Sequence, residues 1–187
     1  MKSLAWGLAL ALTLSAAARQ RYDVQVPETI EVAGKKLTLI GMGLRKKSFF
    51  KVYLASNYVE QVTTDLEEVI RRDMVKRVEL HMLRGVDKGT IVNGIREGFQ
   101  KNSGPQLPAL QARMAQFEAA IPDLHEHDVL AFTHVPGQGL TVALNGKDRA
   151  QIPGKDFAEA LWSVWLGKNP VDDGLRNEMM IGAGVQQ

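Results

Sequence analysis

The sequence predicts an α+β fold, in which helices pack on one face of a largely antiparallel sheet. Two observations predict it. Segments that alternate apolar with polar residues, and are rich in β-branched and aromatic side chains, occur near both ends of the chain. Other segments repeat apolar residues every three or four positions, as helices that bury one face do. The order of segments is several strands, a helix, a strand, two helices, three strands and a helical end, which is typical of α+β proteins.

The first predicted strands precede residue 60. Residues 23–34 alternate branched apolar with polar residues, residues 35–43 continue as a second short strand, and residues 49–59 are the most strongly β-type segment. Residues 45–48 are expected to form the turn between the last two strands. Alternation divides the third strand into a core face and a mixed, partly polar face. The core face holds Phe50, Val52, Leu54 and Tyr58, and the mixed face holds Phe49, Lys51, Tyr53, Ala55 and Asn57.

The middle of the chain alternates between helix and strand. A short helix is expected over residues 64–72 with Thr64 as its N-cap, followed by a strand over residues 76–83. Two helices follow, over residues 87–101 and 108–120. Each carries a narrow apolar stripe that must pack on another element. The stripes are Ile91, Ile95 and Phe99, and Leu110, Met114 and Phe117.

The last third of the chain returns to strands and ends in helices. Asn145-Gly146 is a strong hairpin signal between two of the strands. The final long helix contains Leu161, Trp162, Trp165 and Leu166 at helical spacing, which is more typical of a core stripe than of a docking surface. The expected elements are strands over residues 128–135, 140–146 and 148–154, and helices over residues 156–166 and 172–180.

The first residues have the pattern of a cleaved signal peptide. Lys2 supplies a positive charge, Leu4 to Leu14 an apolar region, and Ala16-Ala17-Ala18 a small-residue cleavage site. The apolar region is shorter than the ~20 residues that a membrane span needs. We therefore expect a signal peptide over residues 1–18, export to a bacterial periplasm, and a single domain over residues 19–187.

Composition excludes several classes of function. The formal net charge of the chain is only +2, and its Lys and Arg residues are scattered, apart from the run Arg45-Lys46-Lys47. This distribution gives no electrostatic case for binding nucleic acid or an anionic membrane. The chain has no cysteine, which excludes disulfides and thiol catalysis. His125 and His127 lie in a charged loop without the second ligand pair of zinc motifs, so we expect no metal there. Residues 41–46 lack the third glycine of a dinucleotide motif, and we expect no cofactor.

Arg45 has two interpretations. It is either a turn cation facing water or a clamp for an anion, because a guanidinium binds a carboxylate through two parallel hydrogen bonds. In the second case, Phe49 and Tyr53 on the mixed face of the neighbouring strand could hold the rest of the ligand.

Three ordered segments resemble chalcone isomerase-like proteins. Residues 41–60 resemble the N-terminal signature of that family, residues 127–142 its strand and hairpin, and residues 160–180 its C-terminal helix and tail. The resemblance implies an open-faced sandwich, a large antiparallel sheet packed by a layer of helices, with a ligand cleft between the two. This agrees with the α+β fold expected from the periodicity alone.

The resemblance also implies roles for single residues. Arg45 stands where the family's plant enzymes carry the arginine that steers the substrate phenolate, and where its fatty-acid-binding members carry an arginine against the ligand carboxylate. Tyr53 replaces a threonine of the enzymes, and residues 87–101 contain no counterpart of their tyrosine. Asn93 lies in this helix and is taken as a ligand-binding residue with Arg45, Phe49 and Tyr53. Arg45 and Tyr53 would be catalytic residues only if the protein were an enzyme.

Three functions follow, each with a different partner. The first is an exported, non-catalytic protein that binds a small amphipathic anion, such as a fatty acid, near Arg45. The second is an isomerase of the chalcone–flavanone type, with Arg45 as electrophile and Tyr53 as donor. The third is an interaction protein of the cell envelope, docking a protein partner through its tryptophan helix or an edge strand. None of them includes nucleic acid, a metal, or a membrane span after signal cleavage.

Overall fold

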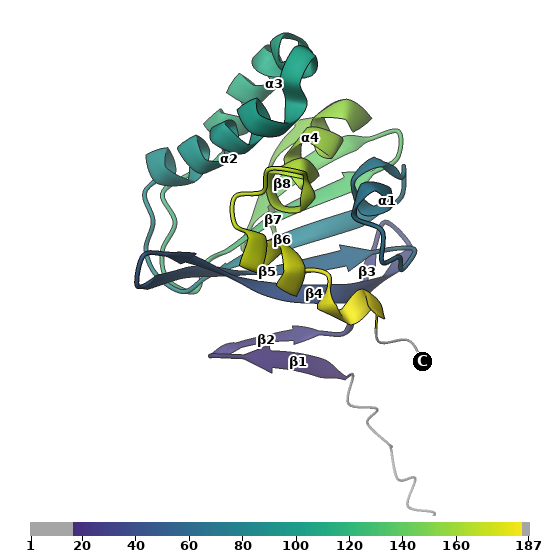
Figure 1. Ribbon diagram of the computed structural model, residues 1–187, viewed down its shortest axis with the longest axis vertical. Helices are drawn as coiled ribbons and strands as arrows, with labels where there is room; N and C mark the ends of the chain where they lie inside the picture. Colours follow the sequence, from purple (N-terminus) through teal and green to yellow (C-terminus); the bar gives the residue numbers. More distant parts are fainter. Residues whose placement is uncertain (1–16, 185–187) are drawn as a thin grey trace, which may run out of the picture.

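Seven strands form a single antiparallel sheet in the computed structural model, which describes residues 17–184 (Figure 1). Residues 1–16 of the predicted signal peptide lie outside the described residues. The strands follow one another across the sheet in chain order, so each pairs with its neighbours in sequence. They are β3 (Thr29–Val32), β4 (Lys35–Lys47), β5 (Phe50–Val59), β6 (Lys76–Met82), β7 (Val129–Val135), β8 (Gly139–Leu144) and β9 (Lys147–Ile152).

The turn between β4 and β5 differs from the prediction. Arg45 and Lys46 pair with Tyr53 and Lys51 on β5, so the cationic run continues β4 and does not form the turn. The turn is made by Ser48 and Phe49, and Ser48 takes the left-handed conformation with φ 55°. A hairpin turn can consist of only two residues, so the residues before Ser48 can gain ladder hydrogen bonds.

A β-bulge changes the faces of β5 near this turn. The register shifts between Arg45 and Lys46, which leaves one extra residue, Val52, on β5. Because side chains alternate strictly along a strand, one extra residue moves those beyond it to the opposite face. Phe50 and Val52 therefore lie on the side of Tyr53, and their assignment to a core face with Leu54 and Tyr58 was wrong.

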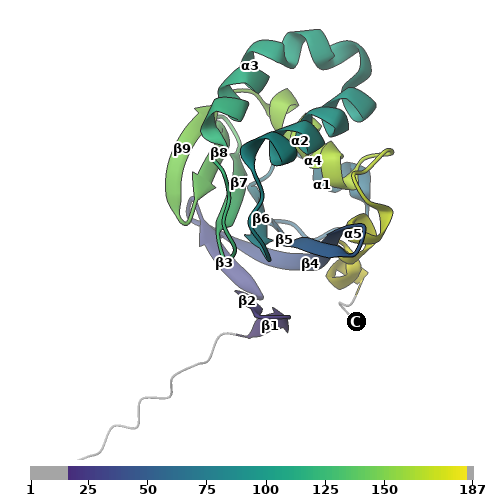
Figure 2. The ribbon, with the colours of Figure 1, turned by 90° about the vertical axis from the view of Figure 1, so that its left-hand side faces the viewer.

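Helices cover the concave face of the curled sheet (Figure 2). Asp65, not Thr64, caps the first helix, because its carboxylate accepts hydrogen bonds from the backbone N–H groups of Glu67 and Glu68. The helices are α1 (Leu66–Arg71), α2 (Lys88–Ser103), α3 (Leu107–Ala120), α4 (Lys155–Leu166) and α5 (Asp173–Glu178), with 3₁₀ turns at Gly104–Gln106 and Ile181–Gly184. Among the described residues, no helix is both long and apolar enough to cross a bilayer.

The main core lies between the helices and the sheet. The predicted stripes of α2 and α3 are buried there, and Trp162 and Trp165 on α4 are fully buried. Phe132 on β7 contacts Trp165, with ring centroids 5.8 Å apart. This confirms the core interpretation of the tryptophan helix. It also removes the version of the interaction-protein hypothesis in which these tryptophans dock a partner.

A small hairpin covers part of the opposite face. It consists of β1 (Ala18–Arg21) and β2 (Val24–Pro27), and its Val26 packs in a second apolar cluster with Leu54 and Tyr58 of β5. The Tyr58 hydroxyl donates a hydrogen bond of 2.9 Å to the backbone carbonyl of Pro27. Residues 23–34 are thus two strands, β2 and β3, and not the single strand that was expected.

Candidate functional site

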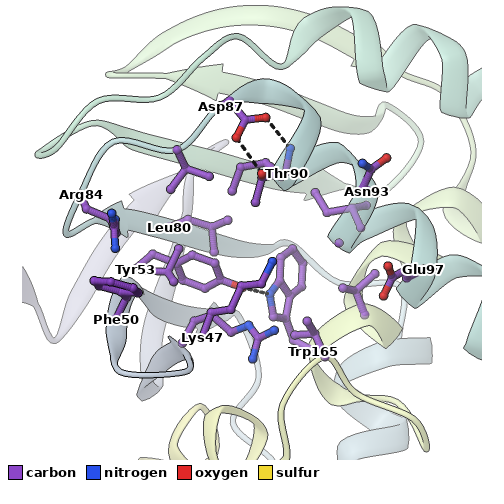
Figure 3. Close-up of a pocket in the computed structure, with 18 of the residues that line it drawn as sticks. Lys47, Phe50, Tyr53, Leu80, Arg84, Asp87, Thr90, Asn93, Glu97 and Trp165 are labelled. Atoms are coloured by element: carbon purple, nitrogen blue, oxygen red, sulfur yellow. Dashed lines mark hydrogen bonds between the residues drawn. The ribbon is translucent and has the colours of Figure 1, made fainter.

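A cavity of about 850 Å³ lies between α2 and strands β4–β6 (Figure 3). Its inner wall is apolar, with Leu80 on β6, Ile91 and Ile95 on α2, and Val164 and Trp165 on α4. Its rim is polar and carries charges of both signs: Arg45, Lys47, Arg84, Asp87, Asn93 and Glu97. The bulge in β5 adds Phe50 and Val52 to the lining, so the local irregularity of the strand enlarges the apolar part of the site.

Tyr53 provides a polar group on the sheet side of the cavity. Its side chain is buried, and its hydroxyl oxygen accepts a hydrogen bond of 3.2 Å from the indole N–H of Trp165. Burial raises the pKa of the Tyr53 phenol above its usual 10.0, so the group is neutral at ordinary pH. With the oxygen already accepting from Trp165, the phenol proton is free to be donated to a ligand.

Arg45 lies on the same face and is tied to the C-terminal region. Its Nη1 donates to the Asp172 carboxylate at 3.0 Å and to the backbone carbonyl of Lys46 at 2.9 Å. Asp172 also caps α5 by accepting a hydrogen bond from the Leu175 backbone N–H at 3.0 Å. Arg45 is thus neither a fully solvated turn cation nor an unpaired clamp. Nη1 donates both of these hydrogen bonds, so the N–H groups on Nε and Nη2 can donate to a ligand.

The Gly-x-Gly pair before Arg45 has a structural reason. A Cβ atom on Gly41 would lie 2.2 Å from the backbone carbon of Met179, and one on Gly43 would lie 2.5 Å from the carbonyl oxygen of Leu175. The backbone of the α5 region therefore lies directly on β4, at a distance that only glycine permits. This contact brings Asp172 beside Arg45.

Two further cations at the rim were not identified from the sequence. Lys47 and Arg84 line the mouth of the cavity, and the Arg84 guanidinium lies 4.4 Å from the ring centroid of Phe50 (Figure 3). Lys47 was missed because it was assigned to a turn. In an extended strand it shares a face with Arg45, two residues before it. Arg84 lies in the loop before α2, where no local pattern indicates the direction of a side chain.

The structure brings together three of the four predicted ligand-binding residues. Arg45, Tyr53 and Asn93 line the same cavity, Asn93 from the exposed side of α2. Phe49 is not among the lining residues, because it occupies the hairpin turn and is 99% exposed. Phe50, which the sequence pattern assigned to the core face of the strand, lines the cavity in the position that was expected for Phe49.

Within residues 17–184, no group of three His, Asp or Glu side chains could hold a metal ion. His125 lies in an exposed loop, as its sequence context indicated. His134 is a buried strand residue whose Nε2 lies 2.9 Å from the Asp73 carboxylate.

Comparisons with known proteins agree with this architecture. A family model described as chalcone isomerase-like matches residues 18–181. The fold is similar to that of a fatty-acid-binding protein of Arabidopsis thaliana, with a TM-score of 0.69 and 16% sequence identity, over 90% of this chain and 97% of the plant protein. No curated protein matches the chain. At this level of identity, the similarity to the plant protein establishes the fold.

Proposed function

The chain belongs to the chalcone isomerase-like family, and from this premise we propose that it is a non-catalytic protein that binds a small amphipathic anion, such as a fatty acid, in the cavity beside Arg45. The observation that carries the proposal is the composition of the cavity. Its apolar inner wall adjoins a neutral phenol donor and several cations at the rim. Its volume of about 850 Å³ is within the range of small-molecule sites.

The proposed pose follows from the polarity of the lining. The carboxylate of the ligand accepts hydrogen bonds from the Tyr53 hydroxyl and from the Arg45 N–H groups that Asp172 leaves free. Lys47 adds positive charge at the mouth. The hydrocarbon chain lies against Leu80 and Ile91, where each buried methylene contributes about 0.8 kcal/mol. Asn93 is placed at the rim as a further donor to the headgroup.

One observation favours the enzyme alternative as the second candidate. Tyr53 and Arg45 line one cavity, and a neutral phenol together with a guanidinium can polarise a ketone. The polar side chains that α2 presents to the cavity are Thr90, Asn93 and Glu97, and the tyrosine that the plant enzymes carry has no counterpart. We therefore propose binding rather than ring closure. Incubating the protein with a chalcone and following its absorbance should give no rate above the spontaneous reaction.

Titration with a long-chain fatty acid tests the proposed binding. The Arg45→Ala variant should bind about 10- to 100-fold more weakly, because a hydrogen bond to a charged group contributes about 1.5–3 kcal/mol. The Arg96→Ala variant is the matched control, since Arg96 forms an ion pair with Glu118 outside the cavity. Equal affinity in the wild type and in Arg45→Ala, with both proteins folded by circular dichroism, would refute the proposed role of Arg45. No binding by the wild type would refute the function itself.

The proposed site of action is the bacterial periplasm. Support comes from the pattern of Lys2, the apolar run Leu4 to Leu14 and the small residues Ala16-Ala17-Ala18. An envelope interaction protein that docks a protein partner through an edge strand is the competing proposal. The titration separates the two, because a protein with a vestigial cavity would not bind the fatty acid.

A further inference from the structure

Exposed aromatic side chains gather at one end of the molecule. Phe49 and Phe50 at the β4–β5 turn are 99% and 59% exposed, and Tyr22 in the β1–β2 turn is 41% exposed. The two hairpin tips point the same way (Figure 1), and Lys51 Nζ lies 3.9 Å from the ring centroid of Tyr22. Four large apolar side chains are strongly exposed within residues 17–184, and the fourth is Ile181. Three of these four exposed side chains, Tyr22, Phe49 and Phe50, lie at one end of the molecule and form a patch. Exposed apolar patches of this kind mark interaction surfaces.

Cations surround these rings. Lys46 and Lys47 precede the turn, Lys51 follows it, and Arg84 lies over Phe50. From residue 35 to residue 59, the hairpin contains no Asp or Glu.

Acidic side chains near this end are set apart from the turn. Asp172 is paired with Arg45, and Glu178, which interacts electrostatically with Lys46, is paired with Arg21. Asp87 and Glu97 lie across the cavity on the side of α2. Asp23 is next to Tyr22 in the β1–β2 turn. The β4–β5 turn itself is therefore apolar at its summit and positive around it. Composition alone gave no electrostatic case for an anionic membrane, because it shows neither the exposure of Phe49 and Phe50 nor that the fold brings Arg84 over Phe50, beside Lys47.

This chemistry matches one kind of partner. Lipid headgroups of an anionic bilayer attract Lys and Arg at about 1 kcal/mol for each residue near the surface. Aromatic rings that project beyond such cations can enter the boundary between headgroups and acyl chains. A two-residue turn that projects a fully exposed phenylalanine is convex, and a deformable bilayer accepts a convex tip without a preformed pocket.

We propose that this tip, defined as residues 46–51 with Tyr22 and Arg84, docks the protein on an anionic lipid bilayer, with Phe49 and Phe50 inserted among the headgroups. The tip and the cavity mouth coincide, because Lys47, Phe50 and Arg84 belong to both. Docking therefore turns the mouth toward the bilayer, where an amphipathic ligand is concentrated. The proposal does not depend on the identity of the ligand in the cavity.

Vesicle sedimentation tests the docking. The probes are vesicles of phosphatidylcholine alone and vesicles containing about one third phosphatidylglycerol. The protein is used as its host processes it, with the N-terminus checked by mass spectrometry, because an uncleaved apolar segment would itself bind lipid. The wild type should bind the anionic vesicles at least about tenfold more tightly than the neutral ones, and salt should weaken this binding.

Two variants locate the contact without touching the cavity. Phe49→Ser and Lys46→Glu should each weaken binding to anionic vesicles by about tenfold. Neither residue lines the cavity, so binding of fatty acid from solution should be unchanged in both. Their matched controls are Ile181→Ser and Lys147→Glu, an exposed apolar residue and an exposed lysine elsewhere, which should bind vesicles like the wild type.

A spectroscopic variant provides an independent readout. In Phe49→Trp the new indole should shift its emission to shorter wavelength when anionic vesicles are added. The indoles of Trp162 and Trp165 are already buried and should contribute little change. No wild-type binding to anionic vesicles, or unchanged binding in both Phe49→Ser and Lys46→Glu, would overturn the proposal. A lipid-free dimer that is lost in Phe49→Ser would assign the tip to a second copy of the chain instead.

Discussion

Lys76 shows how a single buried cation can make stability depend on pH. Its ammonium group donates hydrogen bonds to the carbonyls of Val69 and Ile70 at 2.9 and 2.5 Å, and lies 5.1 Å from the ring centroid of Trp162. Burial lowers the pKa of Lys76 from 10.5 to about 8. The group therefore satisfies the last carbonyls of α1 at the cost of placing a charge in the core.

The depressed pKa of Lys76 predicts a rise in stability with pH. Between about pH 8 and pH 10 the unfolded chain binds more protons at this lysine than the folded chain does, so the free energy of unfolding increases with pH. We expect a gain of roughly 1–2 kcal/mol between pH 8 and pH 9.5 relative to Lys76→Met, measured by urea unfolding. Lys147→Met, at an exposed lysine, is the control and should follow the wild type. Parallel curves for the wild type and Lys76→Met would contradict the assignment.

Above about pH 10, the buried tyrosines oppose the effect of Lys76 on stability. Burial raises the pKa values of Tyr53 and Tyr58, so above about pH 10 the unfolded chain loses phenol protons that the folded chain retains. This lowers stability as pH rises and opposes the effect of Lys76.

At the scale of elements, the attachment of α5 to β4 organises the site. Within residues 17–184, β3 pairs only with the first four residues of β4, and no strand pairs with the rest of that edge of β4. Side chains bind the backbone there instead. Glu178 accepts from the Leu44 backbone N–H at 2.7 Å and from Arg21 Nη1 at 2.8 Å, and Arg21 Nη1 donates to the carbonyl of Met42 at 3.3 Å. One ion pair thus joins β1, β4 and α5.

The close approach of α5 predicts a severe effect for a small change. Gly41→Ala would place a methyl group against the backbone of Met179, which cannot move without displacing α5 and its contacts. We expect a loss of about 1–3 kcal/mol or more in the free energy of unfolding, measured by urea denaturation. The same replacement at Gly94 on α2 meets nothing within 4 Å, and should leave stability unchanged or raise it by up to about 1 kcal/mol. Equal stability of Gly41→Ala and the wild type would show that α5 does not lie on β4.

Over the whole molecule, the proposed cleavage would remove a small part of the N-terminal contacts, among them the Ala17 carbonyl that accepts a hydrogen bond of 2.8 Å from the Glu28 backbone N–H. The predicted cleavage after Ala18 falls at the first residue of β1, and Arg19, Gln20 and Arg21 keep their pairing with β2. Arg19 also forms an ion pair of 3.0 Å with Glu28. A chain cleaved after Ala18 would therefore keep most of the hairpin that covers the second face of the sheet.

The proposed export predicts a defined N-terminus. Protein recovered from the periplasmic fraction of its host should begin at Arg19 by intact mass, and Ala18→Lys should retain the signal peptide, because the cleavage site requires small residues. The Lys147→Glu variant is a suitable control for a change of charge outside the signal. Full-length protein confined to the cytoplasmic fraction would contradict the prediction.

The α+β class, the order of strands and helices from residue 35 onward and the burial of the α4 tryptophans could all be predicted from the amino-acid sequence, because they follow from periodicity and from turn signals such as Asn145-Gly146. The division of residues 18–32 into three short strands could not. Which residues line the cavity depends on the three-dimensional packing. Because of a one-residue bulge in β5, Phe50 lines the cavity where Phe49 was expected. Because the backbone of the α5 region lies against Gly41 and Gly43, Asp172 lies beside Arg45. Local patterns encode the class of an element. Packing between distant segments decides where a side chain points near an irregularity in a strand. It also decides which residue that side chain contacts when the two are more than a hundred positions apart in sequence.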